Sequence, residues 1–131
     1  MSNQLYPKGK GHVLGASTKV DFVADTVKAM LIHSATTPYN SAHEFVSDLV
    51  SGGIVARSGA LGGKTVTLGV LDANDVTLLA VTGSSVDAVI LYKDTGADGT
   101  SVLCAWWDVS SFTPSGADVT DVWNASGLFS I

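Results

Sequence analysis

The segment Gly59-Ala-Leu-Gly-Gly-Lys-Thr65 contains the residue types that bind nucleotide phosphates in a glycine-rich loop. In such loops backbone N–H groups surround the phosphate, and a lysine reaches it from the start of a helix. The spacing does not fit, because Ser58 stands where the motif needs its first glycine. The residues that follow, 66–70, alternate as in a β-strand and do not predict the required helix. We therefore interpret the segment as a turn with an exposed Lys64.

The other polar residues form no recognisable catalytic or metal-binding pattern. His12, His33 and His43 do not stand at metal-ligand spacing from one another or from Cys104. The acidic turn at residues 72–75 lacks the central glycine and the distal glutamate of a calcium loop. A nucleophile elbow of the type Gly-x-Ser-x-Gly does not occur. We expect a protein that is not an enzyme and that holds no cofactor and no metal.

Composition indicates a single domain with few charges. The 131 residues suit one domain, and charged residues make up 15% of them, against a typical value of about 25%. The net charge is −5 and the cations are scattered, so we expect no nucleic acid as a partner. No apolar run approaches the roughly 20 residues of a spanning helix, so we expect no membrane either. The mean hydropathy of +0.33 fits either a surface shielded in an assembly or a chain rich in Gly, Ala and Val.

Short alternating segments separated by turn residues predict the elements that carry these side chains. Residues 4–13 predict a short helix after Pro7, and Ser41 with Glu44 forms a capping-box pattern that predicts one or two helical turns over 41–48. The expected strands cover residues 18–34, 54–57, 64–71, 76–81, 86–93, 101–109, 118–123 and 127–131. The chain 1–131 is therefore predicted to be one mainly β domain, an antiparallel β-sandwich or jelly-roll-like barrel with one or two short helices. Residues 1–16 form an N-terminal arm or short helix.

The two strands 86–93 and 101–109 predict a hairpin that is apolar on both faces. Trp106 and Trp107 are adjacent, so they point to opposite sides of their strand. We place one face of the hairpin in the core: Val86, Ala88, Ile90, Tyr92, Leu103, Ala105, Trp107 and Val109. The other face is also too apolar to be fully exposed, and a second sheet, the N-terminal segment or a neighbouring subunit must cover it.

Four residues are therefore candidates for an interface with another chain: Tyr6, Val89, Leu91 and Trp106. The alternative for each of them is the intramolecular core, because such faces are often covered internally. Trp123 and Phe129 near the end of the chain are assigned to the core.

Several motifs spread along the chain resemble a family of small tailed-bacteriophage structural proteins of the capsid decoration (cement) type. They are Gln4-Leu-Tyr-Pro-Lys-Gly-Lys10, Asp25-Thr-Val-Lys28, His43-Glu-Phe-Val-Ser-Asp48, residues 54–66, Tyr92-Lys-Asp-Thr-Gly96, and the closing residues 119–124 with Phe129-Ser-Ile131. The chain departs from the family pattern at Gly11-His12 and in the aromatic strand around Trp106. These motifs are structural, so no catalytic residue is implied.

The resemblance implies a virion component on the outer capsid surface that is made in the host cytoplasm. Its expected partner is the major capsid protein, which it would stabilise through non-covalent contacts, and a homo-oligomer is expected, with a trimer favoured. Two alternatives remain open, a tail or neck component and a receptor- or glycan-binding module of a phage fibre. For the glycan-binding module, the loops at residues 72–75 and 94–99 are the expected contact sites.

Overall fold

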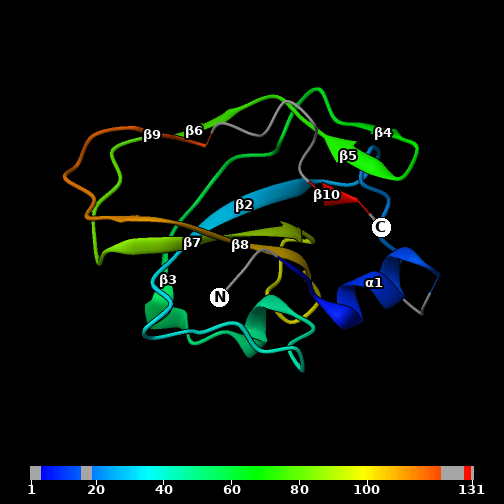
Figure 1. Cartoon of the computed structure of the whole chain (residues 1–131), viewed down its shortest axis with the longest axis horizontal. Coiled ribbons are helices and arrows are strands. Elements are labelled where there is room, and N and C mark those ends of the chain that lie inside the picture. Colours follow the sequence, from blue (N-terminus) through cyan, green and yellow to red (C-terminus); the bar gives the residue numbers. More distant parts are fainter. Residues whose placement is uncertain (1–3, 16–18, 122–128, 131) are drawn as a thin grey trace.

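The computed structural model describes residues 4–15, 19–121 and 129–130. They form antiparallel sheets, a short α-helix and two 3-10 helices (Figure 1). The strands are β1 Gln4–Leu5, β2 Val27–Ile32, β3 Ile54–Arg57, β4 Thr65–Thr67, β5 Val70–Asp72, β6 Val76–Leu78, β7 Val86–Lys93, β8 Val102–Phe112, β9 Val119–Asp121 and β10 Phe129–Ser130. The helices are α1 Pro7–Val13 and the 3-10 helices Val46–Asp48 and Ser51–Gly53. The predicted mainly β, antiparallel fold is confirmed, in a sandwich-like form.

A five-stranded sheet lies at the centre, with the strand order β1-β8-β7-β2-β3. Its longest pairing joins β7 to β8, which are the two strands of the predicted hairpin. Strand β2 alternates as its sequence predicts, because Ala29 and Leu31 pack on one face while Met30 and Ile32 pack on the other. The period-2 pattern of apolar residues thus fixes which side chains enter each layer.

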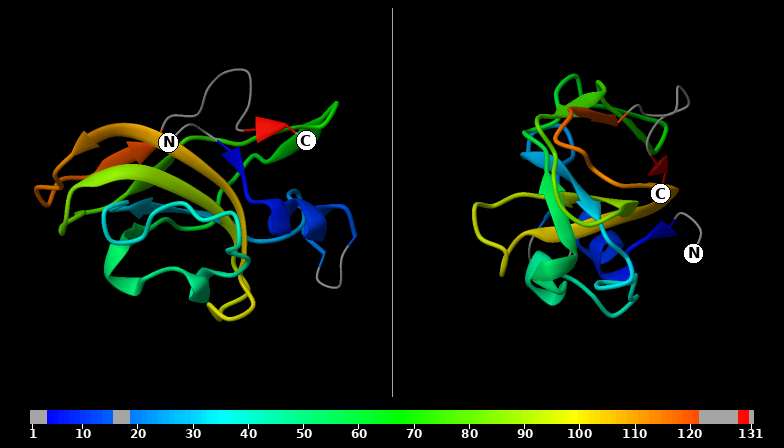
Figure 2. Two further views of the ribbon diagram at one scale, coloured as in Figure 1. Left: turned by 60° about the horizontal axis from the view of Figure 1, so that its bottom comes forward. Right: turned by 90° about the vertical axis from the view of Figure 1, so that its left-hand side faces the viewer.

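Both faces of this sheet are covered by other parts of the same chain. Above it in Figure 1, the small sheets β10-β5-β4 and β6-β9 contribute Leu71 and Leu78 to two apolar clusters. Below it, the N-terminal segment and the first 3-10 helix contribute Tyr6, Val46 and the adjacent Leu49 to a third cluster. The two views of Figure 2 show these layers on either side of β7 and β8. Full burial of one such side chain stabilises the fold by about 1.5–3 kcal/mol.

A β-bulge in β8 changes the faces that the sequence predicts. Consecutive residues of β7 stand opposite Leu103 and Ala105, so Cys104 is an extra residue in the ladder. Leu103 and Trp106 consequently share the lower cluster, whereas Cys104 and Ala105 belong to an upper one. The prediction that Leu103, Ala105 and Trp107 line a common core face is wrong for this reason, and Trp107 is only half-buried.

The N-terminal arm covers the outer edge of β8. The backbone N–H of Tyr6 donates to the carbonyl of Cys104 at 2.9 Å, and α1 begins at Pro7, as predicted. Gly9 faces the backbone of β8 so closely that an added Cβ would stand 2.1 Å from the carbonyl oxygen of Leu103. A glycine is needed here for close approach, although glycine lowers helix propensity.

The helical turn predicted over residues 41–48 is present only as the 3-10 helix Val46–Asp48, and Ser41 does not cap it. The carboxylate of Asp48 accepts hydrogen bonds from the backbone N–H groups of Glu44 and Phe45, at 2.8 and 2.9 Å. These bonds cap the 3-10 helix Val46–Asp48, whose N-cap residue is Phe45 and not Ser41. The acidic side chain that stabilises the turn is therefore Asp48, within the predicted segment but at its other end.

Residues 64–71 form a hairpin instead of the predicted single strand. The turn between β4 and β5 is Leu68–Gly69, with φ angles of 51° and 78°. Positive φ at both central residues is typical of a type I′ turn, which suits the twist of a two-stranded ribbon. The chain therefore reverses where the alternating pattern suggested that it continues.

Trp123, which the sequence assigned to the core, lies outside the described residues, as does the side chain of Phe129. Among the helices of the described ranges, none has the length and apolarity needed to span a membrane.

Candidate interaction surface

The four interface candidates Tyr6, Val89, Leu91 and Trp106 are all buried within the chain itself. Val89 and Leu91 lie under the small upper sheets, while Tyr6 and Trp106 lie in the lower cluster. The structure therefore places them in the intramolecular core, the alternative to an interface, because a second layer and the N-terminal arm cover both faces of the hairpin. In this arrangement none of the four offers a surface to another chain.

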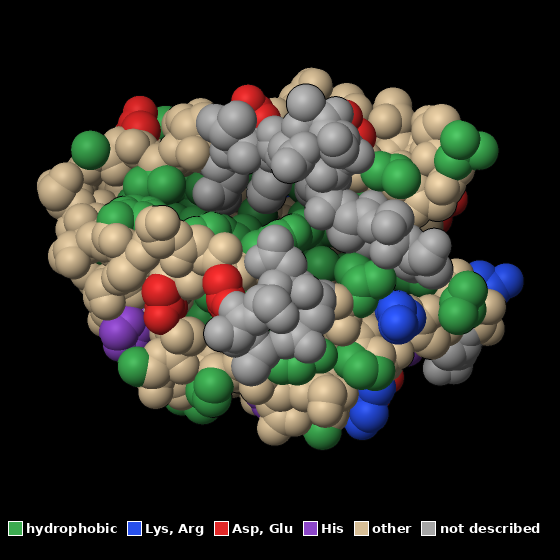
Figure 3. Space-filling view, viewed as in Figure 1, with side chains coloured by type: hydrophobic (Ala, Val, Ile, Leu, Met, Phe, Trp, Pro, Cys, Tyr) green, Lys and Arg blue, Asp and Glu red, His purple; other side chains and the backbone are tan. Residues whose placement is uncertain are grey.

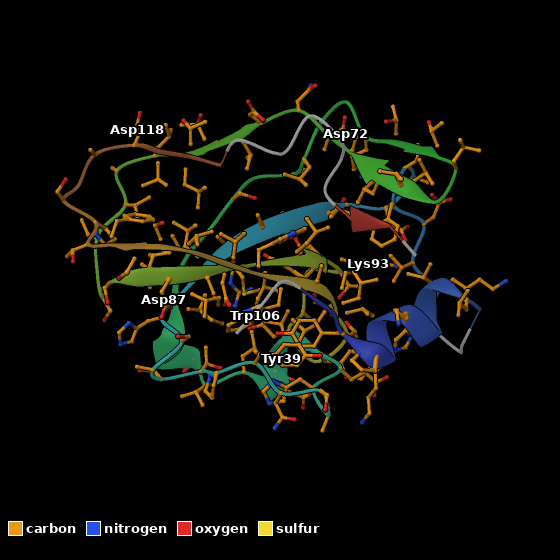
Figure 4. The ribbon with its side chains drawn as sticks, viewed as in Figure 1. Tyr39, Asp72, Asp87, Lys93, Trp106 and Asp118 are labelled. Atoms are coloured by element: carbon orange, nitrogen blue, oxygen red, sulfur yellow. The ribbon has the colours of Figure 1, made fainter. Side chains whose placement is uncertain are left out.

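Trp106 belongs to an aromatic group below the central sheet (Figure 4). The ring of Tyr39 stands edge-on to Trp106, with centroids 5.9 Å apart, and its centroid is 5.1 Å from that of Tyr6. The indole N–H of Trp106 donates to a carboxylate oxygen of Asp108 at 2.9 Å. Burial, with a smaller effect of Tyr39, raises the pKa of Tyr6 far above its usual range. The Tyr6 hydroxyl therefore stays protonated at neutral pH, and its ring packs against Tyr39.

The residues that first suggested phosphate binding serve the fold. Lys64 donates to the backbone carbonyl of Asp25, and the strand β4 follows it where a phosphate site needs a helix. The interpretation of residues 59–65 as a turn with an exposed lysine is right about the missing helix. It is incomplete about Lys64, which ties the loop before β2 to the hairpin.

Two of the three histidines, His12 and His33, are held by nearby groups of the chain. Nε2 of the buried His12 is 2.6 Å from a carboxylate oxygen of Glu44, which ties α1 to the segment before the first 3-10 helix. Nδ1 of His33 lies 2.8 Å from the carbonyl oxygen of Ser85. Across the described ranges, His, Cys, Asp and Glu side chains do not gather in threes that could hold a metal ion.

The two acidic loops considered for glycan binding use carboxylates to hold their own structure. Asp94 lies 2.6 Å from the ammonium group of Lys28, and this contact holds the pKa of the Asp94 carboxyl below its usual value. Asp98 accepts two hydrogen bonds from the Arg57 guanidinium, at 2.8 and 3.0 Å. Asp72 accepts a hydrogen bond from the N–H of the next residue. The carboxylates of these loops are therefore engaged in contacts within the chain.

The β4–β5 hairpin carries the most exposed large apolar side chain of the described residues. Leu68, in the turn after β4, is 98% exposed, and Val66 on β4 is 50% exposed; all three residues of β4 are exposed. The hairpin occupies the upper right corner of Figure 1, and its turn points away from the body of the molecule (Figure 2, left). Hydrophobic side chains are visible at the surface of this corner in Figure 3.

This hairpin is also free of charge over most of its length. Residues 65–71 contain no charged side chain, and Lys64 and Asp72 stand at its base. Strand β4 is the last strand of its sheet, so its outer edge has no strand beside it in the described part of the chain. Edge strands are often protected by charged side chains, which β4 lacks; of its residues Thr65, Val66 and Thr67, only Val66 is apolar, and Leu68 follows it in the turn. Exposed apolar side chains of this kind are a favoured place for contact with another chain.

Sequence reasoning missed this surface because Leu68 continues the alternation of the residues before it. The sequence did contain one signal for a turn here, the glycine at position 69 just before Val70. Glycine readily adopts the left-handed backbone conformation that such a turn needs. Two other leucines, Leu14 and Leu79, are about three-quarters exposed, but each stands singly, which is normal for a protein surface.

No protein-family model matches the chain, and no curated protein matches its sequence. The resemblance to phage structural proteins stays a prediction.

Proposed function

We propose that this chain is a non-enzymatic structural component of a virion, a capsid decoration or cement protein. It binds the major capsid protein at the outer shell, after synthesis in the host cytoplasm, and stabilises the shell through non-covalent contacts. The observation that carries this proposal is the uncharged edge of the β4–β5 hairpin with its exposed Val66 and Leu68. The resemblance of the motifs in residues 4–10 and 54–66 to small tailed-bacteriophage proteins supports a shell as the partner.

The contact at one hairpin is small, so the proposed role depends on many such contacts being made at once on the shell. Burying Leu68 contributes about 1.5–3 kcal/mol at one site. A trimer, the favoured oligomer, would present three hairpins at once, and linked contacts raise the overall affinity far above that of one site. Many symmetric copies on one shell would then add up to a measurable gain in its stability.

The deciding experiment compares purified shells with and without the protein. Calorimetry follows the melting of the shell, and sedimentation measures how much protein stays bound after washing. We expect the decorated shell to melt at a higher temperature. A shell that melts identically without the protein, together with no bound protein, would show that decoration is wrong.

A second measurement tests the oligomer. The mass of the isolated protein in solution is expected at three times that of the 13.4 kDa chain. A mass equal to one chain at every concentration contradicts the trimer and leaves shell binding to be judged by sedimentation alone.

A further inference from the structure

Leu68 occupies a position of the hairpin that is unfavourable for leucine in two respects. Its φ of 51° lies in the left-handed region, where a side chain with a Cβ crowds the backbone. Its side chain is 98% exposed, so it gains nothing from burial in the chain itself. Asparagine followed by glycine is the favoured sequence for such a turn, and Gly69 already supplies the second residue. A leucine here stabilises neither the turn nor the core.

We propose that Leu68 is the anchor of the proposed shell contact and inserts into an apolar, uncharged pocket of the capsid protein. This inference rests on the proposed function and names the part of the surface that performs it. A residue that is unfavourable for its backbone conformation, and that gains nothing from contacts inside the fold, is expected at a functional position. The turn holds Leu68 at the tip of the hairpin. The buried side chain of Leu71, on β5, attaches the hairpin to the rest of the molecule.

The size of the hairpin favours a repeating shell over a second copy of this chain as the occupant. A stable protein pair needs about 800 Å² on each side, contributed by about 20–30 residues. The hairpin from Thr65 to Asp72 has only eight residues, well below that number. A contact of this size is effective where a lattice presents many equivalent sites to linked copies.

The absence of charged side chains on the hairpin predicts the character of the partner's pocket. Because residues 65–71 are uncharged, the pocket needs no ionic group to match them, and binding through it is expected to change little with salt. A contact made through the ion-paired loops at residues 94–98 would weaken as the salt concentration rises.

The test uses shells assembled from the major capsid protein of the same virus and four forms of the full chain: wild type, Leu68→Asn, Leu68→Met and Leu79→Asn. Leu68→Asn suits the turn but removes the apolar anchor, so we expect a melting temperature equal to or above that of wild type. Its affinity for shells should fall by about 10- to 100-fold. Leu68→Met keeps an apolar side chain and should bind within about threefold of wild type. Leu79→Asn is the matched control at another exposed leucine and should bind normally.

Shell binding is measured by sedimentation at low and high salt, beside thermal melting of each isolated variant. If Leu68→Asn binds as wild type does, or if Leu79→Asn is equally impaired, Leu68 is not the anchor and decoration itself still stands. Binding that disappears at high salt also overturns the uncharged pocket. Wild type that does not bind shells at all overturns both the anchor and the proposed function.

Discussion

Replacing Gly9 by alanine tests the close contact between α1 and β8, on which the covering of the aromatic strand depends. In the middle of a helix, alanine is favoured over glycine by about 1 kcal/mol. At this position the new Cβ would lie 2.1 Å from the carbonyl oxygen of Leu103, and ordinary contact begins at 3.4 Å. The helix must therefore move by about 1 Å away from backbone atoms that are fixed in the central sheet. Overpacking of this kind costs about 1–3 kcal/mol, and we expect it to exceed the gain in helix propensity.

The matched control is Gly11→Ala in the same helix, where an added Cβ meets nothing within 4 Å. There only the helix propensity changes, so the variant should gain about 0.5–1 kcal/mol. The net cost of Gly9→Ala is about 0–2 kcal/mol, so for a chain of this length it should lower the melting temperature by up to about 8 °C, whereas Gly11→Ala should raise it by about 2–4 °C. Thermal unfolding followed by circular dichroism measures both. If both variants are stabilised equally, α1 does not lie against β8 as described.

Three further predictions concern the buried Trp106, the buried thiol of Cys104 and the carboxylate of Asp48. Trp106→Ala should lower the free energy of unfolding in urea by about 3–5 kcal/mol, and an unchanged value would contradict its place in the core. Burial raises the pKa of the Cys104 thiol to about 12, so a thiol reagent at neutral pH should label it only as the protein unfolds, and fast labelling of the folded protein would contradict this. Hydrogen bonds from the N–H groups of Phe45 and Glu44 hold the pKa of Asp48 below its ordinary 3.8, so the stability from this group is complete above that pH and is lost as the pH falls below it. Asp48→Asn should reduce the loss of stability between about pH 5 and about pH 3, measured from urea midpoints, and an unchanged loss would exclude Asp48 as its source.

The pairing of β7 with β8 could be predicted because it depends on local sequence. Alternating apolar residues define each strand, and the Gly- and Asp-containing loop at residues 94–99 joins them over a short distance. The observation that both faces are apolar correctly predicts a strand with cover on both sides. What provides the cover could not be predicted, because Leu71, Leu78 and Val46 come from segments far away in the sequence.

The face of each side chain on β8 could not be predicted because one extra residue changes it. The bulge at Cys104 shifts the alternation by one position, so residues before and after it exchange sides. Cys104 has no special backbone preference that would mark a bulge in the sequence. The candidate surface was missed for a related reason, since Leu68 fits a continuous strand in pattern and departs from one only in its backbone angle.

The N-terminal arm and the β4–β5 hairpin differ in what their side chains contact, and this difference separates stability from binding. The arm buries Tyr6 and His12 and closes the edge of β8, so substitutions there should alter the melting temperature. The hairpin is attached through the buried Leu71, while every side chain of β4 faces solvent. Changes at its tip therefore remove nothing from the core and can alter affinity without unfolding the chain. A substitution at this tip that weakens the proposed shell binding while the melting temperature stays unchanged would identify the hairpin as a contact surface.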